Sequence, residues 1–359
     1  MELKNFIKNK SVRFAILMAL FYQIAMLGIY MYGYKAIPQN IEQLRVVLVN
    51  NDGAYSEQVV DGFQKSLPFK VEISKDMKKS EAKLQEREVA MIVEVPKDFS
   101  KSVSTGKEVS LNYHINKSNA QTTGSVMNEV ASNITRQMNE KMNPGFKTHV
   151  SSNIIESNKI PGVMSYQMAP MFLTLANYTG AMVASLTLAM VFKTQSKKIG
   201  AYKVFMKVEI VGVIISVVAP ILGAIMVKCF LGIDGSRFIH IYLQGILSLF
   251  TALQFTLIFS LILGQSGTFA NIPILLCQTL ASGAIMGIEM MPNFFKFIAK
   301  STVIYPNTQM LYNILYGGGN SGSYERQLVC VMLVSLAIDF IIVYYHKRKE
   351  DKLLEAGAN

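Results

Sequence analysis

Very few residues of this chain have the types and spacing that catalysis requires. The four histidines are scattered, and no H-E-x-x-H pair sets two of them one helical turn apart as metal ligands. No stretch matches the G-x-x-x-x-G-K-[ST] loop that cradles nucleotide phosphates, and no G-x-S-x-G nucleophile elbow occurs. A serine–histidine–acid triad assembled from distant residues would leave no such signature and stays open. We expect a protein that is not an enzyme, holds no metal or cofactor and hydrolyses no ATP by itself.

The more informative polar residues are those that interrupt long apolar runs. Asp339 is the one acid well inside such a run, and an acid there usually faces a bundle interior, a water-filled path or a partner. Asn177, Gln254 and Asn271 are amides in similar positions, and with Asp339 they could line a path for an amphipathic substrate. The alternative is that they only tie helices together through hydrogen bonds. Glu209 stands at the edge of another run, where we expect it to be solvated or paired with a nearby lysine.

The elements that must position these residues are membrane helices. The chain has 359 residues, of which 51% are hydrophobic and only 16% are charged, more apolar than one soluble core requires. The short connections between several apolar runs predict antiparallel hairpins. We therefore expect a multi-pass α-helical membrane protein with six transmembrane helices, at residues 14–34, 168–192, 208–230, 239–263, 269–288 and 328–345.

The positions of the basic residues predict the orientation of these spans. Five lysines lie between residues 193 and 207, and basic residues near span ends stay on the cytoplasmic side. We expect a plasma-membrane protein whose N-terminal flank, in 1–34, and tail, 346–359, are cytoplasmic, and whose segment 35–167 lies outside. The formal net charge of +11 is concentrated in the cytoplasmic pieces, so it favours contact with the lipid bilayer and not with nucleic acid.

Segment 35–167 has the pattern of a small α/β domain inserted between the first and second spans. Apolar strand-like runs at 45–50, 69–74, 89–95 and 108–115 alternate with helical patterns, among them 78–87 and 119–142. The segment contains no cysteine, so no disulfide can staple it. Its length suffices for an independent core, and we expect it to fold alone.

The lysine-rich loop is a candidate docking site for a cytoplasmic partner. Apolar residues recur at three- and four-residue steps through 199–206, so a short helix there would present an apolar face. Such a face lies either on the inner leaflet or in a groove of a partner, whereas a plain polar loop is the simpler alternative. The predicted docking residues are Lys197, Lys198, Ile199, Tyr202 and Phe205.

An external segment, 289–327, precedes the last span and is unusually apolar. Two amphipathic pieces, 293–304 and 309–316, are separated at Pro306 and followed by three glycines, 317–319. Such pieces can re-enter the outer leaflet if they are buried in protein or line a cavity. A surface loop is the alternative. We place the four spans before it from residue 168 on and the one after it, with this segment, in a membrane unit of five helices, 168–345.

Four stretches resemble a known family. They are RVVLVNNDGA at 45–54, AMIVEVPKDFS at 90–100, APMFLTLANYTGAMVA at 169–184, and 291–319 with Pro292, Phe294, Pro306 and Thr308. The chain resembles the ABC type-2 exporter permeases, in particular short members related to the phage-infection-protein group. Members often carry an arginine shortly before the glycine run, whereas this chain has no basic residue between Lys300 and Arg326.

The resemblance implies a transmembrane permease subunit of an exporter. Two such subunits, identical or related, would pair with cytoplasmic ATPase subunits that bind the ATP, and would move a hydrophobic or amphipathic substrate out of the cell. The alternative is a non-transporting surface protein, a receptor or a component of secretion machinery, that acts through the external domain.

Overall fold

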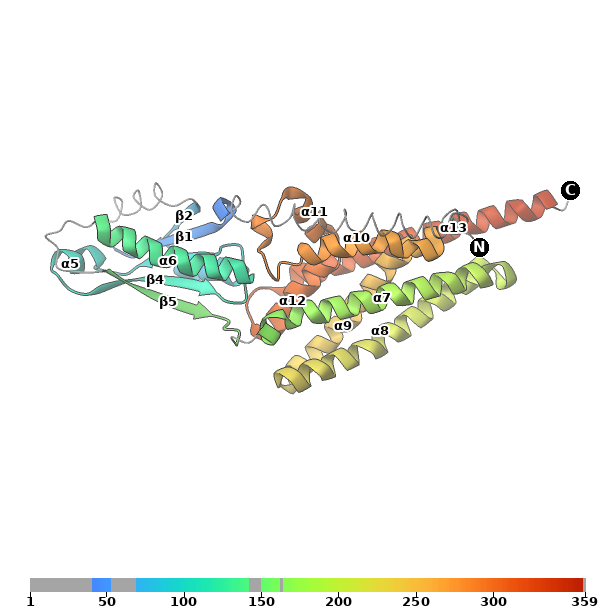
Figure 1. The fold of residues 1–359 in the computed structure, drawn as a ribbon, viewed down its shortest axis with the longest axis horizontal. Coiled ribbons are helices and arrows are strands. Elements are labelled where there is room, and N and C mark those ends of the chain that lie inside the picture. The colour runs from blue at the N-terminus through green and yellow to red at the C-terminus, as the bar shows by residue number, and fades with distance from the viewer. Residues whose placement is uncertain (1–40, 53–68, 142–149, 162–163, 358–359) are drawn as a thin grey trace, which may run out of the picture.

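The chain folds into an α/β domain at one end and a bundle of long helices at the other (Figure 1). This computed structural model describes residues 41–52, 69–141, 150–161 and 164–357. The predicted first span, 14–34, and the flank before it lie outside the described residues.

A mixed five-stranded sheet forms the centre of the α/β domain. The strands are β1 (Arg45–Asn50), β2 (Lys70–Ser74), β3 (Met91–Val95), β4 (Val109–Asn116) and β5 (Val150–Ser157). Their order is β2-β1-β3-β4-β5. Strand β1 pairs in parallel with β2 and β3, β3 pairs antiparallel with β4, and β4 pairs in parallel with β5. Strands β1 and β3 are buried along almost their whole length, which explains their continuous apolar sequences.

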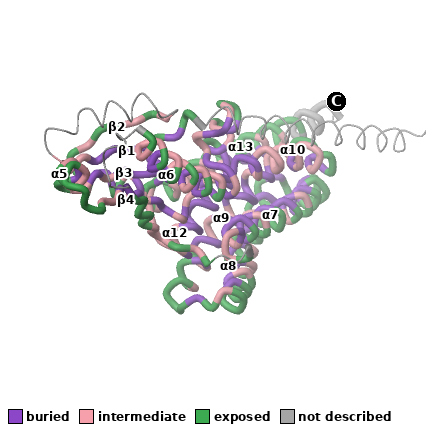
Figure 2. Tube along the Cα trace, turned by 60° about the vertical axis from the view of Figure 1, so that its left-hand side comes forward, coloured by how far each residue is buried: buried purple, intermediate pink, exposed green. Residues whose placement is uncertain are grey.

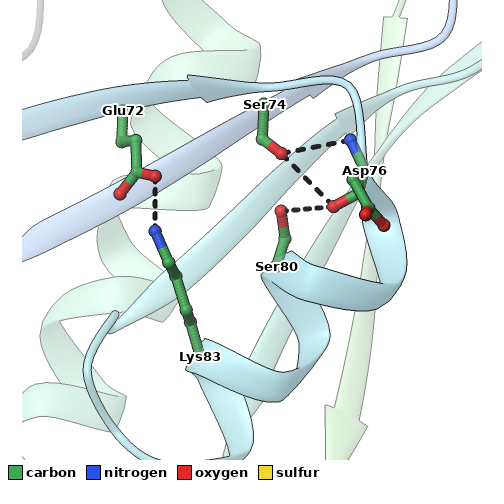
Figure 3. Close-up of polar contacts among 5 residues, drawn as sticks. All are labelled: Glu72, Ser74, Asp76, Ser80 and Lys83. Carbon is green, nitrogen blue, oxygen red and sulfur yellow. Dashed lines mark hydrogen bonds and ion pairs between the residues drawn. The ribbon is translucent and has the colours of Figure 1, made fainter.

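Three described helices accompany this sheet: α4 (Met77–Gln85), α5 (Phe99–Ser104) and α6 (Gln121–Lys141). The start of α4 shows how side chains fix the passage from strand to helix (Figure 3). Asp76 caps the helix by accepting the backbone N–H of Lys79 at 3.1 Å, and the Ser80 hydroxyl donates to the Asp76 carbonyl at 2.8 Å. Lys83 then reaches back to Glu72 on β2 in an ion pair.

Five longer or apolar helices form the bundle: α7 (Met164–Ile199), α8 (Ala201–Leu231), α9 (Gly235–Leu263), α10 (Gly267–Leu280) and α13 (Ser321–Gly357). Within the described chain, four segments are long and apolar enough to cross a membrane. They are Ser165–Ile199, Ala201–Leu231, Gly235–Leu280 and Ser321–Lys349. The predicted tail after residue 345 continues α13 as helix to Gly357.

The fifth predicted span, 269–288, is wrong in extent. Its helix, α10, has 14 residues, which at about 1.5 Å per residue falls short of the roughly 30 Å apolar layer of a bilayer. The helix ends at Leu280, and the chain then turns through Gly283 with φ of +73°. Turn-forming serine and glycine residues between 282 and 287 interrupt an apolar run that hydropathy alone joins together. Six spans are therefore not confirmed.

The segment after α10 is buried in protein and is not a surface loop. It forms a short 3-10 turn (Ile288–Met290) and two helices, α11 (Asn293–Ser301) and α12 (Ile304–Tyr316). Helix α12 packs among α7, α9 and α13, and most of its residues are buried (Figure 2). Helix α12 is thus covered by protein, and re-entry of this segment into the outer leaflet stays a prediction.

The α/β domain and the helical half share one hydrophobic core. Met91, Tyr113 and Met127 of the domain belong to the same buried cluster as Met290 and Phe295, which are 0% and 1% exposed. Two backbone hydrogen bonds add to this contact, because the N–H groups of residues 121 and 122 donate to the carbonyls of residues 284 and 285. The core of the domain is therefore continuous with that of the helical half, and independent folding of the domain stays a prediction.

Candidate transport site

A buried polar cluster joins α8, α9 and α13. Asp339 on α13 and Gln254 on α9 are both 0% exposed. Gln254 Nε2 donates to Glu209 Oε2, on α8, at 2.5 Å, and the ring contact of Phe205 with Phe340 brings the turn of α8 before Glu209 against the part of α13 that holds Asp339. In the described chain, both Asp339 oxygens, Glu209 Oε1 and Gln254 Oε1 are buried without a hydrogen-bond partner. Glu209 is thus partly buried and bonded to Gln254, and among the described residues it forms no ion pair with a lysine.

Three phenylalanines lie beside this cluster. The rings of Phe205 and Phe340 meet edge to face with centroids 4.9 Å apart, and Phe192 meets Phe205 at 6.4 Å. Phe205 precedes Glu209 by one helical turn, towards the end of the bundle where α7 meets α8. Phe340 follows Asp339 towards the same end. The aromatic contacts therefore lie on the same helices as the acidic residues, towards that end of the bundle.

The other two predicted path residues lie elsewhere. Asn271 Nδ2, on α10, donates to the Thr256 carbonyl at 3.1 Å, and this asparagine is fully buried. Asn177, on α7, is 7% exposed and approaches the crossing of Gly245 on α9 with Pro220 on α8. The structure thus brings Gln254 and Asp339 together through Glu209. A path that all four residues share stays a prediction.

The predicted re-entrant residues have different surroundings. Pro292 precedes the first turn of α11, and Phe294 is 51% exposed with its ring edge-on to Phe295 at 5.2 Å. Pro306 lies buried in the first turn of α12. Thr308 is 0% exposed, and its hydroxyl lies 3.3 Å from the hydroxyl of Thr174 on α7.

Thr308 belongs to a hydrogen-bonded network that the sequence analysis did not find. Gln244 Nε2, on α9, donates to Asn307 Oδ1 at 2.6 Å, and Asn307 Nδ2 donates to Thr174 Oγ1 at 3.0 Å. The network ties α12 to α7 and α9. The only sequence signal was an amide in each apolar run, which does not reveal which amides meet.

An arginine does stand near the glycine run, but the α/β domain supplies it. Arg87 is 9% exposed and adopts a left-handed backbone with φ of +61°. Its Nη2 donates to Ser118 Oγ at 3.1 Å, and a Cβ on Gly318 would lie 3.2 Å from that same oxygen. Burial lowers the pKa of Arg87, whereas the neighbouring tyrosines, Tyr324 and Tyr305 foremost, act to raise it. The arginine and the glycine run therefore meet where the domain joins the bundle.

The turn between α7 and α8 forms a groove at the opposite end of the bundle. The predicted lysine-rich loop is almost entirely helical, because α7 runs to Ile199 and α8 starts at Ala201. Gly200 alone makes the corner, with φ of +91°. The groove has a volume of about 790 Å³ and is lined by Lys198, Ile199, Tyr202, Lys203, Met206 and Lys207.

The predicted docking residues divide between the groove and the core. Lys198, Ile199 and Tyr202 line the groove, and Lys197 is exposed next to it. Phe205 is 0% exposed, so the prediction that it anchors a partner is wrong. Once Gly200 starts a new helix, Phe205 shares a face with Ala201, Val204 and Val208, all of which are buried. Met206, Lys203 and Lys207 complete the groove, and their spacing on α8 was the available signal.

Comparison with known proteins agrees with a transport role. The model of the family described as "ABC-2 family transporter protein" matches residues 10–345. The chain is also 32% identical over 127 residues to the uncharacterized protein YhgE of Bacillus subtilis (strain 168), a match that covers 32% of this chain and 16% of YhgE. No solved structure matches. Because the family model covers nearly its whole length, the chain belongs to the ABC-2 family of transporter proteins and is a membrane component of such a transporter.

Proposed function

We propose that this chain is the transmembrane subunit of an exporter that a separate cytoplasmic ATPase drives, and that it moves a hydrophobic or amphipathic substrate outwards. The observation that carries the proposal is the groove between α7 and α8. Ile199, Tyr202 and Met206 are 43%, 40% and 52% exposed there, and the lysines at 198, 203 and 207 surround them. Apolar anchors within a basic rim suit an amphipathic or acidic partner surface.

The orientation of the subunit follows from the same groove. Its lysines favour the cytoplasm, which supports an orientation with the α/β domain on the outer side and the end of α13 inside the cell. The long apolar face of α8 then lies in the bilayer or against a second subunit, identical or related. Ile210, Ile214 and Val218 on this face are 57%, 55% and 59% exposed.

The core that the α/β domain shares with α10 and α11 favours this function over that of an independent surface receptor. A binding module on a linker needs little contact with its anchor. Here Phe295 and Met290 are buried within the core of the domain itself. A movement of the helices would therefore displace residues in the core of the domain, as a transport cycle requires.

Tyr202→Ala combined with Met206→Ala tests the docking role. Anchor residues of this kind contribute on the order of 2 kcal/mol or more to binding, so we expect the double variant to lose the ATPase subunit during purification from membranes. The matched control is Met226→Ala, because Met226 lies on the same helix and is 56% exposed, near the other end. The preparation should be measured for ATP hydrolysis as well as for co-purified protein.

Both α8 side chains are exposed, so the fold should survive their removal. Equal ATPase recovery and ATP hydrolysis for the double variant and the Met226→Ala control would overturn the docking role of the groove.

A further inference from the structure

We propose that Glu209 and Asp339 form a proton-binding site inside the helix bundle. This site is separate from the groove and stands whether or not the proposed function is right. It rests on the burial of Asp339 and on oxygens that lack partners in the described chain: both of Asp339, Oε1 of Glu209 and Oε1 of Gln254. These atoms come from three helices, α8, α9 and α13, that pack on one another.

The balance of donors and acceptors at this cluster calls for a proton. The two carboxyl groups offer four oxygens, and the only hydrogen bond to them within the described residues comes from Gln254 Nε2 to Glu209 Oε2. A buried carboxylate without a donor is costly, and two neighbouring carboxylates resist ionising together. One proton on the pair removes one negative charge and creates an O–H donor. The other carboxyl group, or Gln254 Oε1, is then the acceptor.

The surrounding groups favour a proton over a metal ion or a basic side chain. In the described chain no three His, Cys, Asp or Glu residues gather as metal ligands. Of the helices that pack against α13 at this level, α8 contributes the acid Glu209 and α9 contributes the neutral Gln254 that donates to it. Helices α11 and α12 meet α13 nearer its start, where Gln327 donates to the Ala299 carbonyl and Tyr305 meets Tyr324.

The position of the site suggests how the proton could be held and released. Phe205 and Phe340, whose rings meet with centroids 4.9 Å apart, lie on α8 and α13 between the two acids and the α7–α8 corner along the chain. Glu209 follows Met206, a residue of the groove, by less than one turn of the same helix. A displacement of α8 by a partner in the groove would therefore move Glu209 relative to Asp339, and would separate the two rings.

Infrared spectroscopy of the full-length protein in lipid nanodiscs tests the site directly. A protonated carboxylic acid has a C=O stretching band that is distinct from carboxylate bands and moves to lower frequency in D₂O. At pH 7 we expect the spectrum of the unmodified protein minus that of Asp339→Asn to contain this band. Glu209→Gln should shift the band, because it replaces a hydrogen-bonding carboxyl group next to Asp339.

Glu289→Gln is the control for this experiment. Glu289 is an acid whose pKa burial raises, and it lies in the turn before α11, far from Asp339 along the bundle. Its loss should leave the Asp339 band unchanged. If Asp339→Asn does not fold, titration of the unmodified protein and of Glu209→Gln to high pH gives the same information, because the band should disappear at different pH values in the two proteins.

Two results would overturn the proposal. One is a difference spectrum at pH 7 that contains carboxylate bands and no carboxylic acid band, since Asp339 would then be ionised. The other is a pair of carboxylate bands that respond to added Na⁺, which would assign the cluster to an alkali cation.

Discussion

Phe295 on α11 should be essential for the stability of the α/β domain, although it lies about 180 residues after strand β4 in the sequence. Its side chain is 1% exposed and belongs to the same cluster as Met91 and Tyr113 of the sheet. Phe294, its neighbour in sequence, is 51% exposed, and its ring meets that of Phe295 edge to face. The two residues are therefore a matched pair of the same chemistry and opposite burial.

The expected difference follows from burial. Removing a buried phenylalanine to alanine costs about 3–5 kcal/mol, because both the transferred apolar surface and the packing around it are lost. Phe294→Ala loses one edge-on ring contact, worth about 1 kcal/mol. At about 1.4 kcal/mol per factor of ten, Phe295→Ala should raise the population of the opened domain by about two to three and a half orders of magnitude.

Limited proteolysis of the protein in liposomes measures this population. Cleavage within the domain tracks the opened fraction when closing is fast relative to cleavage. We expect Phe295→Ala to be cut within residues 69–141 far faster than Phe294→Ala, which should resemble the unmodified protein. Equal cleavage rates for the two variants would refute the shared core, because the domain would then be stable without α11.

Two further predictions concern the joint and the orientation. Gly318→Ala should destabilise the protein more than Gly232→Ala in thermal unfolding. Both glycines have positive φ, so alanine costs about 1–2 kcal/mol at either position. A Cβ on Gly318 would in addition lie 2.6 Å from Asn158 Nδ2, whereas nothing lies within 4 Å of a Cβ on Gly232. Similar melting temperatures would mean that the joint adapts to the methyl group. In a variant without the native cysteines, cysteines introduced at Lys75 and at Lys198 should react with an impermeant reagent from opposite sides of the membrane. Labelling of both positions from outside intact cells would contradict the proposed orientation.

Local sequence pattern was sufficient for most of the α/β domain. Strand β1 was predicted with its observed bounds, and β2, β3 and β4 within two residues, because each is a short apolar run that ends at turn-forming residues. Strand β5 was missed. Its sequence, VSSNIIES, is polar and mostly exposed, and it forms a strand because it pairs with β4 at the edge of the sheet. Edge pairing of this kind has no apolar signature.

The membrane half shows where hydropathy stops being informative. The long helices α7, α8, α9 and α13 contain four of the predicted spans, whereas α10 is shorter than the apolar run predicted as the fifth. Apolar character does not distinguish a residue that faces lipid from one that packs against the domain. Met286, Met290 and Met291 are apolar because they complete the core of the α/β domain. Only the tertiary contact separates these uses.

The candidate site was predictable in residue type but not in grouping. Asp339 and Gln254 stood out because an acid or an amide is unusual in an apolar run. Glu209 did not, because its place near Lys207 suggested solvation. Its partial burial depends on α8 starting at Ala201, which turns the face of Phe205 and Val208 into the bundle. The same change of helix phase removes Phe205 from the docking surface and packs its ring against Phe340.

One residue, Gly200, therefore determines which side chains of α8 face the groove and which face the bundle. In a single helix through residues 199–206, Ile199 and Phe205 would share one apolar face. With φ of +91°, Gly200 ends α7 and starts α8 in a new direction. Tyr202 and Met206 then face the groove, while Phe205 and Glu209 face α9 and α13. The first turns of α8 thus connect the surface proposed to receive the ATPase with the carboxyl pair proposed to hold a proton, through a rigid helix and no intervening loop.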